Sequence, residues 1–91
     1  MKKIWHDDAW EKYLYWQGQD RRTIKKVNEL LKDIERNGYK GKGKPEPLKG
    51  DLAGWWSVKI DEKNRLVFKI EEQDGERMLI ISQCGTHYKD K

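Results

Sequence analysis

One short segment, residues 41–49, combines residue types that can do chemistry and reads GKGKPEPLK. Its only carboxylate, Glu46, lies between two prolines, and each proline fixes its own φ at about −65° and pushes the preceding residue toward extended backbone. Glu46 is therefore presented on a stiff segment. With Lys40 included, residues 40–49 hold four lysines and one glutamate, a net charge of +3 in a chain of net charge +4. Such a segment predicts an anion-binding site that contains one placed carboxylate.

The composition predicts one small folded domain. The chain has 91 residues, enough for a single core, so we expect one domain over residues 1–91. Charged residues make up 40% and hydrophobic residues 35%, a balance that approaches that of disordered chains. Five Trp, four Tyr and one Phe supply a large apolar area in few residues, and from them we expect an aromatic-anchored core.

Charge and cysteine usage limit the classes of partner and cofactor. The net charge of +4 favours an anionic partner, and nucleic acid ranks ahead of a membrane because the sequence has no long apolar run. No apolar signal-peptide region follows the basic start Met1-Lys2-Lys3, so we expect a cytoplasmic protein. Cys84 is the only cysteine and no Cys/His pair has the spacing of zinc ligands, so the sequence predicts neither a disulfide nor a structural metal.

The first half of the chain reads as a strand and two helices. Residues 2–5 predict a short strand, after which Asp7 or Asp8 can cap a helix that Gly18 ends. Asp20 can cap a second helix, which Gly38 stops. One apolar stripe recurs at helical spacing along the second helix: Ile24, Val27, Leu30, Leu31 and Ile34. The short link between the helices predicts an antiparallel helical hairpin.

The second half of the chain reads as a β-meander. Alternating patterns over 55–60, 65–70 and 78–84 predict three strands, joined by turns at 61–64 and 73–76. The predicted fold is α+β: an antiparallel sheet packed by the two-helix hairpin, in the order β-α-α-β-β-β with room for one further strand. The opposite face of the sheet, or its edge, is left for function.

Six groups of residues, in order along nearly the whole chain, resemble the YoeB family of the RelE toxin superfamily. They are Ile4-Trp5, Tyr13-Leu14-Tyr15-Trp16, residues 41–49, Trp56-Ser57, Arg65-Leu66-Val67 and His87-Tyr88. The resemblance implies a microbial-RNase-like, RelE-like α+β fold and a ribosome-dependent endoribonuclease that cuts mRNA in the ribosomal A site without a metal or cofactor. It also implies a homodimer, and a YefM-type antitoxin that holds the toxin inactive.

The resemblance also implies roles for individual residues. Carried over by position, Glu46 matches the base, His87 the acid and Arg65 the phosphate-stabilising residue. Tyr88 matches the tyrosine beside the histidine. Metal-free RNA cleavage needs a base to take the proton of the 2′-OH, an acid to protonate the departing 5′-oxygen, and a cation to stabilise the added negative charge. The product of that reaction is a 2′,3′-cyclic phosphate.

The acid and base candidates fit these roles unequally. The ordinary histidine pKa of about 6.5 leaves His87 partly protonated near neutral pH, as an acid requires, although an isolated histidine this near the end of a chain is usually a surface residue. An exposed glutamate among lysines is ionised but weakly basic. Either partial burial offsets the lysines, or Glu46 orients the hydroxyl while Lys49 or Lys44 supplies the electrostatics, and the sequence leaves both open.

Arg65 and Tyr88 complete the catalytic candidates, and three lysines are the substrate-binding candidates. Arg65 opens a predicted strand, where its planar fork can hold two phosphate oxygens, although an arginine on a strand usually faces solvent. Lys59 stands where relatives are expected to carry arginine, which keeps the charge and loses the fork. With Lys44 and Lys49 it is assigned to substrate binding. Tyr88 can stack on a base, an interaction of about 1–3 kcal/mol.

Two other functions stay open from the residues alone. One is a non-catalytic RNA- or ribosome-binding module, and the other is a protein-interaction domain whose basic groove receives an acidic antitoxin segment. The joint presence of Glu46, Arg65 and His87 favours the enzyme. Phosphate affinity alone requires neither a carboxylate in the basic segment nor a histidine near the end.

Overall fold

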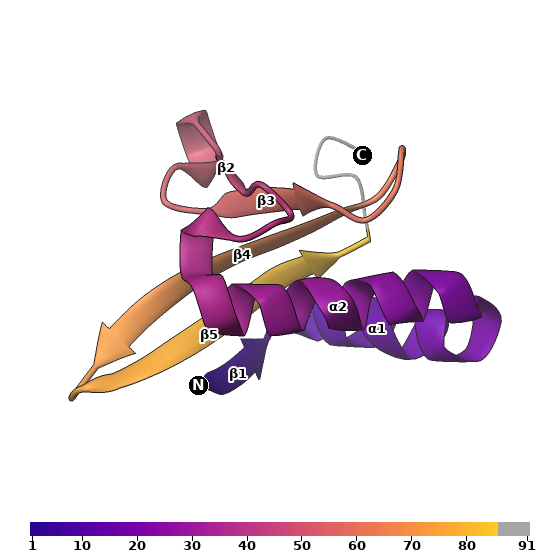
Figure 1. Cartoon of the computed structure of the whole chain (residues 1–91), viewed down its shortest axis with the longest axis horizontal. Coiled ribbons are helices and arrows are strands. Elements are labelled where there is room, and N and C mark those ends of the chain that lie inside the picture. Colours follow the sequence, from indigo (N-terminus) through magenta and orange to yellow (C-terminus); the bar gives the residue numbers. More distant parts are fainter. Residues whose placement is uncertain (86–91) are drawn as a thin grey trace.

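The computed structural model describes residues 1–85, and Figure 1 shows its helices and strands. In chain order they are strand β1 (Lys2–Trp5), helices α1 (Asp7–Gln19) and α2 (Arg21–Asn37), and strands β2 (Glu46–Pro47), β3 (Trp56–Lys59), β4 (Arg65–Gln73) and β5 (Glu76–Cys84). Two 3₁₀ turns, η1 (Gly38–Lys40) and η2 (Gly50–Leu52), flank β2. This order confirms the predicted α+β fold, with the further strand included.

The five strands form one sheet in the order β1-β5-β4-β3-β2. The pairs β2–β3, β3–β4 and β4–β5 are antiparallel, as predicted. β1 instead runs parallel to β5, so the sheet is mixed and not wholly antiparallel. A parallel neighbour requires a long connection between the two strands, and the helical hairpin after β1 provides it.

Helix α2 begins and ends as the sequence predicts. The Asp20 carboxylate accepts hydrogen bonds from the backbone N–H groups of Arg22 at 3.0 Å and Thr23 at 3.3 Å, which satisfies two free donors of the first turn. At the other end Gly38 has a φ of 62°, a value that glycine adopts at little cost. The apolar stripe is covered, with these members buried: Val27, Leu30, Leu31 and Ile34.

Two predictions about the ends of helix α1 are wrong. His6 is the N-cap residue, and Asp7 and Asp8 lie in the first turn, where their negative charge still stabilises the helix dipole. The helix also continues through Gly18 to Gln19, because a single glycine inside a packed helix costs only about 1 kcal/mol. It ends where the next residue turns to extended backbone to cap α2.

Both predicted turns of the meander are present. Between β3 and β4, the Asp61 carboxylate accepts hydrogen bonds from the backbone N–H groups of Lys63 at 2.8 Å and Asn64 at 2.7 Å. Between β4 and β5, Asp74 and Gly75 have φ values of 53° and 78°, typical of a two-residue hairpin turn. Because this turn is tight, β4 and β5 extend closer to it than predicted.

The core lies on one face of the sheet. Register links Val58, Leu66 and Cys84 across β3, β4 and β5, and these buried side chains join the stripe of α2 and Ala9 of α1 in one cluster. Phe68 is the one fully buried aromatic residue among residues 1–85. The expected aromatic-anchored core is found in part: Phe68 lies in it, and half-buried rings pack against an otherwise aliphatic centre, because large rings are rarely enclosed completely in a small domain.

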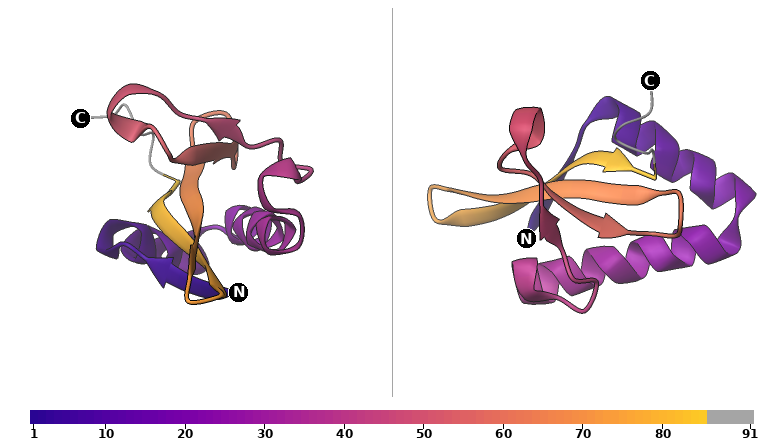
Figure 2. Two further views of the ribbon diagram at one scale, coloured as in Figure 1. Left: turned by 90° about the vertical axis from the view of Figure 1, so that its left-hand side faces the viewer. Right: turned by 90° about the horizontal axis from the view of Figure 1, so that it is seen from above.

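The other face of the sheet carries polar residues. Seen from above, the two helices diverge from their link on either side of the projected sheet (Figure 2, right). On the face away from the core, register aligns Glu46, Ser57 and Val67 across β2, β3 and β4, and pairs Lys59 with Arg65. This face holds most of the candidate site.

Among residues 1–85, no helix has both the length and the apolar character needed to cross a bilayer.

Candidate active site

A small cleft opens at the end of this polar face, with a volume of about 260 Å³. Its lining comes from the loop before β2 and from β2, β3 and β4: Gly43, Lys44, Glu46, Ser57, Lys59 and Arg65. Sites for drug-sized ligands usually have about 300–1,000 Å³, so this cleft is small.

Strand pairing brings the lining residues together. β2 places Glu46 opposite Ser57, and the β3–β4 pair places Lys59 opposite Arg65. Residues two apart on a strand point to the same face, so Ser57 and Lys59 share it. Four of the predicted site residues line this one cleft: Lys44, Glu46, Lys59 and Arg65.

Ser57 is a cleft residue that the sequence analysis missed. The Arg65 side chain is half-buried, and its Nη1 donates a hydrogen bond to Ser57 Oγ at 3.3 Å. Ser57 is only 1% exposed, so this hydroxyl holds one branch of the guanidinium from the inside. Within residues 1–85 the guanidinium makes no other hydrogen bond, so its remaining donors can bind an anion. Alternation puts Ser57 on the same face as Lys59 of the predicted strand, but that pattern alone does not mark it as a site residue.

The charges of the cleft are unequal. Three cations, Lys44, Lys59 and Arg65, surround one carboxylate, so the cleft attracts anions. Glu46 is exposed to solvent. Among the described residues, the partial burial that would offset the lysines is therefore not found.

Lys44 has a backbone conformation that is uncommon for a residue with a side chain. Its φ is 56°, in the left-handed region that favours glycine and asparagine. Its N–H donates a hydrogen bond to the carbonyl oxygen of Gly41 at 3.1 Å, which closes a turn just before Pro45. The conformation costs about 1–2 kcal/mol, and it is kept at a residue that lines the cleft.

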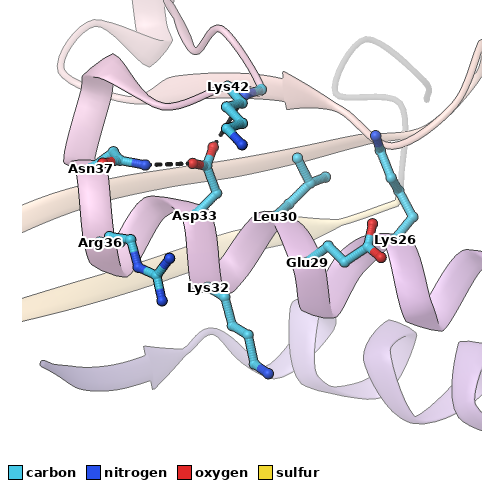
Figure 3. A pocket seen from close by; sticks show the side chains of 9 residues that line it. Lys26, Glu29, Leu30, Lys32, Asp33, Arg36, Asn37 and Lys42 are labelled. Atoms are coloured by element: carbon cyan, nitrogen blue, oxygen red, sulfur yellow. Dashed lines mark hydrogen bonds between the residues drawn. The ribbon is translucent and has the colours of Figure 1, made fainter.

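The loop that carries Glu46 is fastened to helix α2 by Asp33 (Figure 3). The Asp33 carboxylate accepts hydrogen bonds from the backbone N–H of Gly43 at 3.1 Å and from the Asn37 side-chain amide at 2.8 Å. A Cβ at Gly41 would collide with the same carboxylate. The loop can therefore approach Asp33 this closely only because residue 41 is glycine. These contacts lie in a groove that adjoins the cleft, since Gly43 lines both.

The same contacts lower the pKa of Asp33. Partial burial acts to raise the pKa, but the hydrogen bonds from Asn37 and Gly43 and the positive charge of Lys42 together hold it below that of an ordinary aspartate. The ionised carboxylate is therefore the form that stabilises the folded loop. Nothing in the helical pattern distinguishes Asp33 from the other charged residues of α2.

The remaining predicted site residues lie elsewhere. Lys49 is not among the residues that line the cleft and is the N-cap of η2. His87 and Tyr88 lie outside the described residues. The last described residue, Gly85, donates its N–H to the carbonyl oxygen of Arg65 at 2.8 Å, so the described chain ends beside a cleft residue. The catalytic and binding roles of all seven predicted residues stay predictions.

Similarity to known proteins extends over almost the whole chain. Residues 5–88 match the model of the family described as the YoeB-like toxin of bacterial type II toxin-antitoxin system. The chain belongs to this family. It is 49% identical to Toxin YoeB of Escherichia coli K12 and 44% identical to Toxin YoeB of Streptomyces coelicolor, in both cases over 97% of this chain and 100% of the relative. It is therefore the toxin of a type II toxin-antitoxin system.

Solved structures of relatives have the same fold. The YoeB/ParE toxin from Agrobacterium tumefaciens is 40% identical and has a TM-score of 0.89, covering 97% of this chain and 100% of that chain. The YoeB dimer from Staphylococcus aureus is 40% identical with a TM-score of 0.82, covering 97% and 98%. A heterotetrameric YoeB–YefM toxin-antitoxin complex from Staphylococcus aureus has a TM-score of 0.83, with the same identity and coverage. The family and fold expected from the sequence are confirmed.

Proposed function

We propose that this toxin is a ribosome-dependent endoribonuclease that cuts mRNA in the ribosomal A site. Glu46 orients the 2′-OH and receives its proton, and the oxygen attacks the adjacent phosphorus while His87 protonates the departing 5′-oxygen. Arg65 stabilises the charge added to the phosphoryl oxygens. The products are a 2′,3′-cyclic phosphate and a free 5′-OH, and the broken message stops translation.

The other predicted residues bind the strand. Lys44 and Lys59 contact the phosphates on either side of the cleavage point, and Lys49 contributes charge from outside the cleft. Tyr88 stacks on a base next to the cut, an interaction that accepts any base because every base has an aromatic face.

One observation carries this proposal: a carboxylate and three cations share one cleft on the sheet. A site that only bound phosphate would gain nothing from Glu46, because an exposed carboxylate repels the anion. Its presence among the cations supports chemistry at the 2′-OH. The ribosome would contribute by holding the mRNA in line for attack.

We also propose that the toxin forms a homodimer in the cytoplasm and is held inactive by a YefM-type antitoxin. The YoeB dimer and the YoeB–YefM complex of Staphylococcus aureus support both partners. Helix α1 offers contact area for them, because its large apolar side chains Trp10, Leu14 and Tyr15 are 44%, 45% and 51% exposed.

The test is cleavage on programmed ribosomes, with mRNA ends mapped by primer extension. The proteins are the wild type, Glu46→Ala, Arg65→Ala and His87→Ala. Glu62→Ala is the matched control, because Glu62 is also an exposed glutamate but lies in the β3–β4 turn and does not line the cleft. We expect the wild type and the control to cut equally and the three site variants to lose most of the cleavage.

Two results would contradict parts of the proposal. Cleavage retained by both Glu46→Ala and His87→Ala would remove the acid–base assignment. A wild-type protein that binds ribosomes and leaves the mRNA intact would make the chain a non-catalytic binding module.

A further inference from the structure

A groove lies between helix α2 and the loop that leads to Glu46 (Figure 3). This α2 groove has a volume of about 440 Å³, within the usual range of ligand sites. Gly43 lines both the groove and the cleft, and its two neighbours divide between them: Lys42 lines the groove and Lys44 lines the cleft. The two hollows therefore meet at Gly43.

The α2 groove has an excess of positive charge. Its charged lining residues are four cations and two carboxylates, a net charge of +2: Lys26, Lys32, Arg36, Lys42, Glu29 and Asp33. The Asp33 carboxylate is already occupied, because the Asn37 side chain and the Gly43 backbone donate hydrogen bonds to it. Within residues 1–85, none of the four cations forms an ion pair. The groove should therefore attract anions, as the cleft does.

The cations are spread along the helix and do not surround one point. Lys26 and Arg36 are ten positions apart on α2, which is about 15 Å along the helix axis. Lys42 and Lys44 then continue the positive charge into the cleft, where Arg65 lies. One small anion could contact only part of this surface, whereas a strand of phosphates could contact all of it.

An acidic peptide is the other polyanion to consider. A peptide that docks in a groove usually inserts apolar side chains as anchors. Leu30 is the only apolar side chain among the described residues that line the α2 groove, and it is 5% exposed. The groove therefore offers a peptide almost no apolar surface, while phosphates need only its cations. These features favour a nucleic-acid backbone.

We propose that the α2 groove binds phosphates of the RNA strand that continues from the cleft beyond the cleavage point. That the ligand is RNA rests on the proposed function, whereas the charge of the groove and its junction with the cleft do not. The groove extends the strand-binding surface from the sheet to helix α2. A strand long enough to reach Lys26 and Arg36 should therefore bind more tightly than one that fills the cleft alone.

The first test measures RNA binding without ribosomes and without cleavage. The probes are fluorescent 2′-O-methyl RNAs of about 3 and about 12 nucleotides, which lack the attacking hydroxyl. The groove variant is Lys26→Gln/Arg36→Gln. The matched control is Arg21→Gln/Lys25→Gln, which removes one arginine and one lysine from the same helix at exposed positions that do not line the groove. Circular dichroism checks that both variants fold.

The groove variant should bind the long RNA about 10-fold more weakly than the wild type does. The slope of log affinity against log salt should also be smaller by about 1.4, because two phosphate contacts are lost. Binding of the short RNA by the groove variant, and of both RNAs by the control, should stay within about twofold of the wild type.

Three results would overturn the proposal. The first is a groove variant that loses no more affinity for the long RNA than the control loses. The second is a wild type that binds the short and long RNAs equally well. The third is a polyglutamate peptide that binds the wild type but not the groove variant while the long RNA binds both, which would assign the groove to an acidic protein partner.

The second test uses cleavage on programmed ribosomes. The groove variant should raise the half-saturating concentration several-fold and leave the maximal rate within about twofold, because Lys26 and Arg36 lie outside the cleft. A wild type that cuts no mRNA would contradict the proposed function, and the RNA-binding comparison would still decide the role of the groove. A wild type that cuts, with a groove variant that binds RNA as the control does, would contradict the groove alone.

Discussion

The two segments that lead to the candidate base and acid are held by different forces. The loop of Glu46 is fastened to α2 by the Asp33 carboxylate, which accepts two hydrogen bonds in its ionised form. The end of β5, before His87, is fastened by the indole of Trp16 and by a backbone hydrogen bond to β4. The first attachment contains an ionisable group and the second does not. Acid should therefore loosen the loop of Glu46 and leave the end of β5 unchanged.

The two attachments also share a device. At each of them a glycine lets another element approach so closely that a Cβ would collide: Gly41 against Asp33, and Gly85 against Trp16. Close approach of this kind leaves few alternative positions for the segment. The comparison teaches that a loop and the end of a strand can both be held firmly when each is packed on a helix.

The largest effect should come from Arg65, which takes part in both the cleft and the β5 attachment. Arg65→Ala removes only the side chain, so the backbone hydrogen bond to Gly85 can stay in place while cleavage falls about 100- to 1,000-fold. Arg65→Lys should recover only part of the rate, because an ammonium lacks the planar fork. Single-turnover rates on ribosomes measure both, and full activity of Arg65→Lys would contradict the fork.

The next effect concerns the stability of the β5 attachment. Gly85→Ala should lower the free energy of unfolding by about 1–3 kcal/mol more than Gly75→Ala does, because only the first adds a steric collision. The difference should not vary with pH below neutrality. Burial raises the pKa of the neighbouring Cys84 thiol to about 12, so that group stays neutral. Urea titrations measure the difference, and a marked pH dependence would show that a charge is involved.

A smaller loss of stability, which should depend on pH, is expected when the loop of Glu46 is released from Asp33. Asp33→Ala removes both hydrogen bonds and should lower the free energy of unfolding by about 1–2 kcal/mol near neutral pH. Because native contacts lower the pKa of Asp33, this stabilisation is complete above the ordinary aspartate pKa of about 3.9 and is lost as pH falls through the lower native value.

Urea titrations at several pH values measure this loss, with Asp51→Ala as the control for an exposed aspartate in η2. The gap between wild type and Asp33→Ala should close in acid. A gap that stays constant down to the lowest pH would mean that the charge of Asp33 does not hold the loop.

The smallest effect should be a gain in stability. Lys44→Gly relieves the left-handed backbone, which should raise the free energy of unfolding by up to about 1 kcal/mol after the greater freedom of glycine in the unfolded chain is counted. It also removes a cleft cation, so binding to single-stranded RNA should weaken and depend less on salt. Thermal unfolding and a salt series of binding titrations test the two parts, and a less stable Lys44→Gly would contradict the strain.

The bounds of the two helices differ in how well the sequence predicted them. α2 was predictable because its local signals agree: a cap at Asp20, a stop at Gly38 and an apolar stripe between them. The ends of α1 were not, because packing kept Gly18 helical and the cap of the next helix decided where α1 stops. A local signal fails where a tertiary contact outweighs about 1 kcal/mol of backbone preference.

The same distinction applies to the candidate site. Glu46 and Lys44 could be found from the local cluster of prolines and lysines, and Lys59 and Arg65 were added by resemblance before register placed them together. Ser57 and Asp33 could not be found this way. A serine on an alternating strand and an aspartate on a charged helix face resemble many residues that have no role in a site.

By itself the sequence determined the local properties of this protein: the order of its helices and strands, the turns at Asp61 and Asp74, the stiff basic segment around Glu46, and its family. Only the tertiary structure decided the neighbours: β1 beside β5, Lys59 opposite Arg65, Asp33 beneath the loop, and Trp16 against Gly85. The reason is physical. Helical and strand periods, caps and turns depend on residues a few positions apart, whereas contacts between distant residues depend on how the whole core packs.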